Sequence, residues 1–315
     1  MIVSDSEKAI ISTLVYYDLL DYPLTGLEVF KYLSKDFLKS RPSFLKIQTL
    51  LENGSWLKNI IEQKNGFYFL KDREKLVSQR IERMKIADKK WKKIKKISKR
   101  LGFVPYLRMI GVTGSLTLNN TRPESDLDLL LITKPGRIWT SRFLATGLIS
   151  LMGKKRRTGL TKDKICLNCY LTEQGLEIKP EIKPHNLHAA YEYFRLLPLL
   201  EIKLGLFKDF QKANTWLKNN FFFLQGQKNN LRTIKADWRL TELRVLLEKL
   251  LNNKIGDFLE KKLGQWQKNK IAKKLILRPD DQVVFTDYFL MFHPHSKAPR
   301  LMKAYNSKIK TLFTQ

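Results

Sequence analysis

The segment that decides the fold reads Gly111-Val112-Thr113-Gly114-Ser115, then ten further residues, then Asp126-Leu127-Asp128-Leu129-Leu130-Leu131-Ile132. One acidic residue on each side of Leu127, at the start of an apolar run, predicts a β-strand. Side chains alternate between the two faces of a strand, so Asp126 and Asp128 should point to the same side. Two carboxylates held this close repel each other unless a cation lies between them, and hard oxygen ligands suit Mg²⁺ or Mn²⁺. The spacing therefore predicts a metal site.

The turn at Gly114 and Ser115 follows a second apolar run, Met109 to Val112, which we also expect to be a strand. Backbone N–H groups and a hydroxyl at such a turn could hold phosphate oxygens, because a residue without a side chain lets a phosphate approach closely. A metal site beside a phosphate site indicates nucleotide chemistry. The alternative is that Asp126 only caps a strand and that Asp128 points into solvent.

This arrangement resembles the DNA polymerase β nucleotidyltransferase superfamily, whose motif is an apolar strand, Gly-Ser, a short gap and Asp-x-Asp within a second apolar strand. The resemblance covers residues 104–180 strongly. More loosely, the whole layout is similar to bacterial proteins in which a winged helix precedes a nucleotidyltransferase domain. The resemblance implies that Gly114 and Ser115 contact the β,γ-phosphates of a nucleoside triphosphate and that Asp126 and Asp128 bind a metal pair. The implied reaction moves a nucleoside monophosphate to a hydroxyl acceptor and releases pyrophosphate.

The superfamily often adds a third carboxylate from a neighbouring strand. In the expected strand Ile165 to Leu171 the central polar residue is Asn168. Asn can ligate a metal through its carbonyl oxygen, but it supplies no negative charge and cannot act as a base. We take Asn168 as the third catalytic position, while Asp163 and Glu173, which flank the strand, could fill that place in another register.

Lys154 and Arg156 lie in a basic run that follows an expected apolar helix, Ile138 to Met152. They are candidates to contact the triphosphate or a nucleic-acid acceptor. The alternative is that these cations only favour the dipole at the end of that helix.

The two cysteines, Cys166 and Cys169, cannot form a disulfide framework and are expected to be structural. Residues i and i+3 on a strand point to opposite faces, and a zinc site here would need histidines from the later part of the chain. The four histidines form two pairs in the sequence. Either pair could bind a metal, and the second could lie near the nucleotide, but structural or exposed roles are commoner. The pairs are His185 with His188 and His293 with His295.

The fold class predicted for the 315 residues is α+β, with two or three domains. Helical spacing of apolar residues, then alternation around Lys64-Asn65-Gly66, predicts three short helices and a hairpin, which together make a winged helix. Beyond the transferase core, one of the expected helices runs from Ala189 to Leu200. The predicted units are a winged helix at 1–71, a connecting basic helix at 72–103, a mixed β-sheet core with helices at 104–184 and a helical region at 185–315.

The composition is strongly basic, with 59 Lys and Arg against 30 Asp and Glu and a formal net charge of +29. A field of this sign attracts polyanions, which favours an RNA or another polyanionic acceptor beside the nucleoside triphosphate. Only Lys46 and Lys58 are basic from Ser43 to Ile61, which is a thin surface for reading DNA. The basic run from Lys85 to Arg100 could contact nucleic acid together with Trp91, or could simply be a solvated helix face.

No membrane span is expected, because the longest apolar stretch, Ile138 to Met152, contains Arg142 and is shorter than the ~20 residues that a spanning helix needs. The start of the chain does not read as a signal peptide, so we expect a cytoplasmic protein. The alternative to a transferase is a nucleotide-sensing or DNA-binding regulator that uses the winged helix. Asn168 favours this alternative, and the pair Asp126 and Asp128 opposes it. The acceptor, the base of the nucleotide and the oligomeric state stay open.

Overall fold

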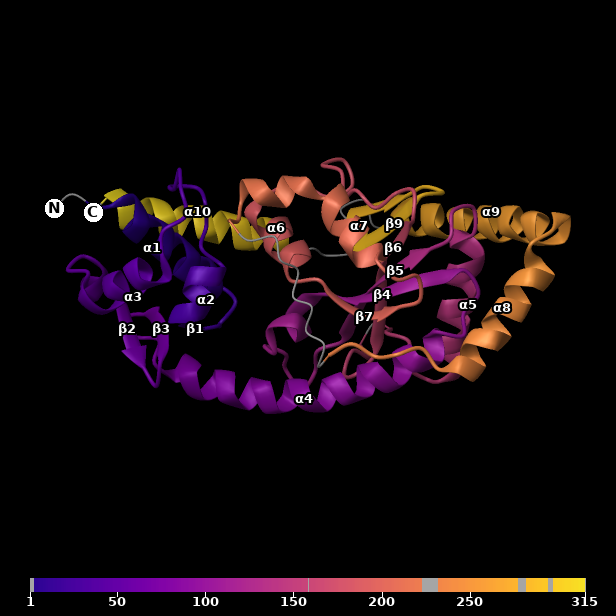
Figure 1. Ribbon diagram of the computed structural model, residues 1–315, viewed down its shortest axis with the longest axis horizontal. Coiled ribbons are helices and arrows are strands. Elements are labelled where there is room, and N and C mark those ends of the chain that lie inside the picture. Colours follow the sequence, from indigo (N-terminus) through magenta and orange to yellow (C-terminus); the bar gives the residue numbers. More distant parts are fainter. Residues whose placement is uncertain (1–2, 158, 223–231, 277–281, 294–296, 315) are drawn as a thin grey trace.

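Residues 3–157, 159–222, 232–276, 282–293 and 297–314 are described by the structure, which is a computed structural model. Within these ranges the chain is α+β, with helices arranged around two separate sheets (Figure 1). None of the helices in the described ranges combines the length and the apolar composition needed to cross a membrane.

The first sheet belongs to an N-terminal unit of three helices and three short strands. Its antiparallel strands lie in the order β1-β3-β2. Ser4, Thr25 and Ser43 cap the three helices, since each side-chain oxygen accepts a backbone N–H from the first turn. The hairpin turns at Asn65 and Gly66, both at positive φ, as the sequence predicted. The elements are α1 (Asp5–Asp18), β1 (Leu24–Thr25), α2 (Gly26–Lys31), α3 (Phe44–Asn53), η1 (Leu57–Asn59), β2 (Ile61–Lys64) and β3 (Phe67–Leu70).

A long helix, α4 (Lys75–Leu101), connects this unit to the second sheet and runs along one side of the whole molecule (Figure 1). Trp91 is buried on its inner face, and the indole Nε1–H donates to Asn119 Oδ1 at 2.9 Å. Trp91 is therefore not exposed for contact with nucleic acid, so the part of the nucleic-acid alternative that included Trp91 is wrong. Six lysines of the run, by contrast, are exposed: Lys85, Lys89, Lys92, Lys93, Lys96 and Lys99.

The second sheet has six strands in the order β7-β4-β5-β6-β9-β8. β5 and β6 are parallel, and the other neighbouring pairs are antiparallel. A short turn of 3-10 helix, η2 (Gly114–Leu118), follows β4, and α5 (Ile138–Leu151) connects β5 to β6. The strands are β4 (Leu107–Val112), β5 (Leu127–Thr133), β6 (Ile165–Thr172), β7 (Leu197–Glu201), β8 (Gln282–Phe285) and β9 (Phe289–His293).

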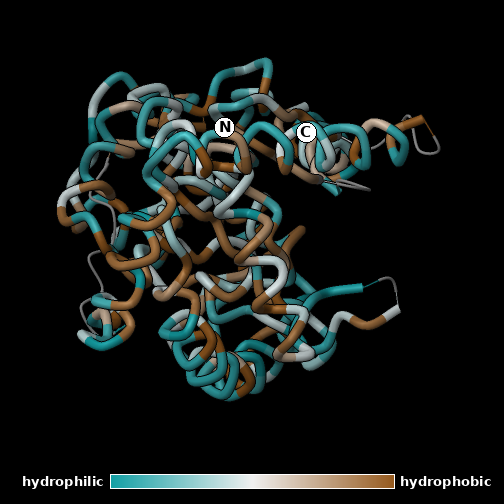
Figure 2. Tube along the Cα trace, turned by 90° about the vertical axis from the view of Figure 1, so that its right-hand side faces the viewer, coloured by the Kyte–Doolittle hydropathy of each residue, from teal (hydrophilic) through white to brown (hydrophobic). Residues whose placement is uncertain are grey.

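Alternation along β5 divides the hydrophobic residues between two cores. Leu127, Leu129 and Leu131 pack in a core with α4 and α5. Leu130 and Ile132 face the opposite side and join a core that extends into the N-terminal unit. Figure 2 shows hydrophobic residues gathered in the interior of the trace, between outer helices rich in hydrophilic ones.

The region 185–315 is not wholly helical, so this part of the prediction is wrong. α6 (Leu187–Phe194) ends before Leu200, because Pro198 lacks an N–H and cannot continue a helix. The chain there becomes β7 and pairs with β4, while β8 and β9 extend the sheet beyond β6. The remaining helices are α7 (Leu206–Ala213), η3 (Thr215–Asn219), α8 (Trp238–Leu251), α9 (Lys254–Ile276) and α10 (Ala298–Thr314).

The last helix, α10, returns to the N-terminal unit, so the two ends of the chain lie close together (Figure 1). Tyr305 hydrogen-bonds Ser12 through the two hydroxyls, and Lys308 pairs with Asp18 at 2.8 Å. Tyr16 of α1 stacks on Tyr191 of α6, with ring centroids 4.1 Å apart.

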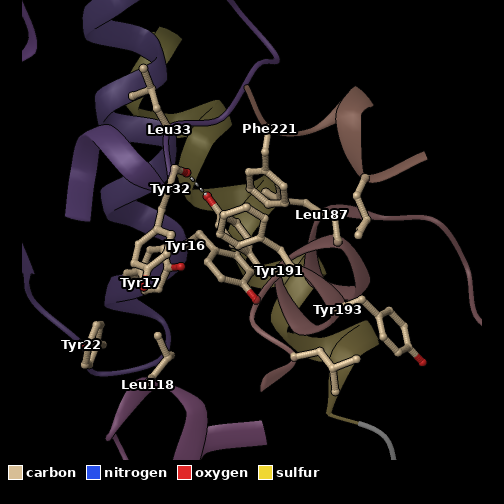
Figure 3. Packing of buried hydrophobic residues seen from close by; sticks show 14 of the residues in the cluster. Tyr16, Tyr17, Tyr22, Tyr32, Leu33, Leu118, Leu187, Tyr191, Tyr193 and Phe221 are labelled. Atoms are coloured by element: carbon tan, nitrogen blue, oxygen red, sulfur yellow. Dashed lines mark hydrogen bonds between the residues drawn. The ribbon is translucent and has the colours of Figure 1, made fainter. Parts of the chain in front are cut away.

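The Tyr191 hydroxyl also donates to the Tyr32 carbonyl at 2.8 Å (Figure 3). The N-terminal unit therefore shares one aromatic core with α6 and α10.

Candidate metal centre

The acidic pair lies where β5 begins, with Asp126 just before the strand and Asp128 as its second residue. The backbone is fixed on both sides: Leu127 N–H donates to the Lys164 carbonyl at 2.8 Å, and Thr113 N–H donates to the Asp128 carbonyl at 3.2 Å. Carboxylate oxygens of Asp126 and Asp128 and the sulfur of Cys166 all lie within 4.8 Å of one another. The prediction that the two carboxylates share one side is confirmed.

Gly114 brings the turn after β4 directly against Asp128. Its φ is +72°, which favours glycine, and a Cβ at this position would lie 2.6 Å from Asp128 Oδ2. Ser115, the next residue, is exposed at the start of η2. The structure thus brings the Gly-Ser turn and the acidic pair together, as the sequence predicted.

A buried cation that the sequence did not reveal holds the loop before Asp126. The side chain of Lys90, from α4, is 2% exposed and donates to the carbonyls of Pro123 and Ser125 at 3.1 and 2.6 Å. It also pairs with Asp163 at 3.0 Å, and Lys93 pairs with the same carboxylate. Lys90 therefore holds the loop that precedes Asp126 and so helps to position this carboxylate.

Neither acid that flanks β6 joins the acidic pair. Asp163 binds the two lysines of α4, while Glu173 pairs with Arg108 at 3.6 Å and with Lys203. The alternative register, which would have made one of them the third carboxylate, is not the register of the structure.

A β-bulge in β6 brings Asn168 to the pair. Leu129 is paired with Leu167 and Leu130 with Cys169, so Asn168 is an extra residue without a partner on β5. Its amide Nδ2 donates to Asp128 Oδ1 at 3.1 Å. The structure places Asn168 beside Asp128 as a hydrogen-bond donor to the carboxylate.

The same bulge decides where the two free thiols lie. Because it shifts the alternation of β6 by one residue, Cys166 and Cys169 occupy the same face of the sheet, and the prediction of opposite faces is wrong. Cys169 is buried in the core against Leu130, its partner in the register. Cys166 is half-buried opposite Asp128, at the acidic pair. No local pattern in the sequence reveals this position, because it depends on the register of two strands.

Arg156 contributes a positive charge to the group. Its Nε lies 3.0 Å from Asp126 Oδ2, and its Nη1 donates to Cys166 Sγ at 3.3 Å. The backbone explains the placement, since Ile165 N–H donates to the Lys154 carbonyl and Arg156 N–H donates to the Ile165 carbonyl. Lys154 is exposed, and no ion pair joins it to the acidic pair in the part of the chain that the structure describes.

When no cation is bound, the surroundings of Asp128 and Cys166 raise the pKa of both side chains and so favour their protonated forms. Burial, and then the charges of Asp126 and Glu192, raise the pKa of Asp128 to about 7, against the opposing effect of Arg156. Burial and the charge of Asp128 raise the pKa of the Cys166 thiol to about 12. Glu192 lies on α6 and forms an ion pair with Lys183. A divalent cation would take the place of these protons.

The histidines have other contacts. His185 stacks on Trp216 with centroids 3.9 Å apart, and His188 Nδ1 is 2.9 Å from the Tyr16 hydroxyl oxygen. His293 is the last residue of β9, and His295 lies outside the described residues.

The residues present fit a divalent cation on three observations. Two carboxylate oxygens and one sulfur lie close together. Gly114 has no Cβ, which would otherwise occupy the space beside the Asp128 carboxylate. The guanidinium of Arg156 already places a positive charge against Asp126 and Cys166. Comparisons with protein-family models, with curated proteins and with solved structures found no match. A function for this site must therefore be inferred from its geometry.

Proposed function

We propose that the chain is a nucleotidyltransferase that depends on a divalent cation and moves a nucleoside monophosphate from a nucleoside triphosphate to a hydroxyl acceptor. The observation that carries the proposal is the juxtaposition of Asp126 and Asp128 with the Gly114 turn, where only glycine leaves room beside Asp128. The resemblance to the DNA polymerase β superfamily leads to the same arrangement, with Ser115 next in the turn. Two segments of the chain, the start of β5 and the turn after β4, would thus supply a cation site and a phosphate site at one place.

The layout of the chain supports this proposal. The order of the first elements, α1-β1-α2-α3-β2-β3, and the sheet order β1-β3-β2 are those of a winged helix, which we assign to residues 1–71. Residues 104–184 would form the transferase core, to which the later strands β7, β8 and β9 add. The basic charge of the chain favours a polyanionic acceptor such as RNA.

In the proposed reaction an oxygen of the acceptor hydroxyl forms a bond to the α-phosphorus, and the bond from that phosphorus to pyrophosphate breaks. A bound divalent cation, Mg²⁺ or Mn²⁺, would neutralise charge on the phosphate oxygens. Asp126 and Asp128 would hold it, while the backbone of Gly114 and Ser115 would orient the β,γ-phosphates. Arg156 lies within reach of the same charge, since its side chain is 42% exposed and borders Asp126.

The test incubates the full chain with Mg²⁺, Mn²⁺, Zn²⁺ or Co²⁺ in turn, each α-labelled nucleoside triphosphate, and RNA, DNA or protein as acceptor. We expect label to enter one acceptor class and to be lost in the double variant Asp126→Ala/Asp128→Ala. Glu124→Gln removes one exposed carboxylate two residues before Asp126 and should keep the activity. Equal labelling by the double variant would contradict the proposal.

One observation favours a second function, a regulator that binds nucleotide without turnover. Asn168 supplies no charge and donates its amide hydrogen to Asp128, where a third carboxylate is often found in the superfamily. The proposed winged helix would then contact DNA. Salt-sensitive binding of duplex DNA and binding of nucleotide, both without transfer of label, would favour this function.

A further inference from the structure

We propose that Cys166 is the third ligand of the cation at Asp126 and Asp128, so that the site prefers a cation that accepts sulfur, such as Zn²⁺ or Co²⁺, over Mg²⁺. The inference rests on the metal site of the proposed function and specifies which cation it takes.

The register of the sheet places the sulfur correctly. Cys166 is the partner of Asp128 on the neighbouring parallel strand, and paired residues point to the same face. Its Sγ and the two carboxylate oxygens lie within 4.8 Å of one another. Zinc binds sulfur at about 2.3 Å and carboxylate oxygen at about 2.0–2.2 Å, usually in a tetrahedral arrangement, so two ligand atoms of one ion stand about 3.5 Å apart. Side-chain movements of up to about 1 Å would bring all three atoms onto one ion.

The other candidates for the third position are excluded by their contacts. Asn168 directs its amide nitrogen, not its carbonyl oxygen, at Asp128, so it orients a ligand rather than binding the ion. Asp163 and Glu173 are held by lysines and arginine elsewhere. Cys169 shares the face of Cys166 but is buried in the hydrophobic core.

The contacts of Arg156 also support Cys166 as the third ligand. The guanidinium of Arg156 contacts both Asp126 and Cys166. The space between this carboxylate and this sulfur therefore favours a positive charge. With its side chain 42% exposed, Arg156 can turn toward solvent when a cation binds.

The chemistry of the ligand set then determines the cation. Mg²⁺ takes oxygen ligands in near-octahedral geometry, whereas sulfur ligands select softer cations such as Zn²⁺. On binding, a metal–sulfur bond replaces the S–H bond and the thiol proton passes to the buffer.

The test titrates the full chain with Co²⁺, without nucleotide, and follows the charge-transfer absorption that a thiolate–Co²⁺ bond gives. We expect the band in the native chain and its loss in Cys166→Ser, with a fall in Co²⁺ affinity larger than the roughly 10–100-fold that loss of an outer partner costs. Cys169→Ala should retain the band. Cys166→Asp should lack it and gain affinity for Mg²⁺.

The outcomes separate this inference from the proposed function. Co²⁺ binding without a thiolate band, or unchanged affinity in Cys166→Ser, would overturn the role of Cys166 and leave the carboxylate site standing. If Asp126→Ala/Asp128→Ala also binds Co²⁺ as the native chain does, both proposals fall. Thermal unfolding of each variant shows whether it is folded, and Cys166→Ala replaces Cys166→Ser if the latter is not.

Discussion

At the scale of single residues, Asp128 makes the stability of the cation-free protein depend on pH. Burial, and then the charge of Asp126, raise its pKa to about 7, above the roughly 4 of an exposed aspartate. The folded chain therefore binds this proton more strongly than the unfolded chain does. The stability that results is present at acid pH and is lost as the pH rises through 7. We expect Asp128→Asn, which carries no such charge, to gain stability over the native chain between pH 5 and pH 8.

Thermal unfolding in the presence of a chelator measures this difference at both pH values. Asp257→Asn serves as the control, since its carboxylate lies on α9, is 58% exposed and pairs with Arg137 rather than with a residue of the acidic pair. Its difference from the native chain should stay constant with pH. A constant difference for Asp128→Asn as well would show that Asp128 is ionised at neutral pH without penalty.

Single residues also differ in whether the sequence could predict their place in the site. Asp126 and Asp128 share a side because of the two-residue period of a single strand, which is a local property. The place of Cys166 depends on the register between β5 and β6 and on the bulge at Asn168, neither of which a local pattern specifies. Lys90, far earlier in the chain, reaches the loop before Asp126 only because α4 packs beneath it.

At the scale of elements, the turn between β4 and η2 requires glycine for two reasons that a pair of variants separates. Gly114 and Gly153 both have positive φ, +72° and +63°, so alanine strains either backbone by about 1–2 kcal/mol. A Cβ at Gly153 meets nothing within 4 Å, whereas at Gly114 it would lie 2.6 Å from Asp128 Oδ2. We expect Gly114→Ala to lose cation binding and Gly153→Ala to retain it, as measured by calorimetric titration. Equal affinities would mean that Asp128 can move aside freely.

The elements also differ in how well their sequences predicted them. α4 and the apolar strands β4 and β5 have long or strongly regular patterns, and their predictions are confirmed. The run from Leu196 to Leu200 is too short for its period to distinguish helix from strand. Its conformation is set by pairing with β4 and by Pro198. β8 and β9 likewise become strands by completing an edge of the sheet, which is a tertiary effect.

At the scale of the whole molecule, α10 ties the end of the chain to its beginning, which no pattern in either segment predicts. Tyr305 is 6% exposed and contacts α1, whereas Tyr288 is 55% exposed. Removing a large buried aromatic side chain leaves a cavity, so Tyr305→Ala should destabilise the chain by about 3 kcal/mol. Tyr288→Ala should change the stability by less than about 0.5 kcal/mol. Thermal or denaturant unfolding measures both changes.

The part of the chain that Tyr305→Ala destabilises is as informative as the size of the change in stability. Because Tyr305 packs on the N-terminal unit and the acidic pair lies in the other sheet, we expect Tyr305→Ala to speed proteolysis within residues 3–70 while cation affinity stays unchanged. Loss of cation binding together with faster cleavage would show instead that the unit of α1, α6 and α10 holds the metal site in place. That result would make the aromatic core between the two sheets a physical link from the proposed winged helix to the proposed transferase site.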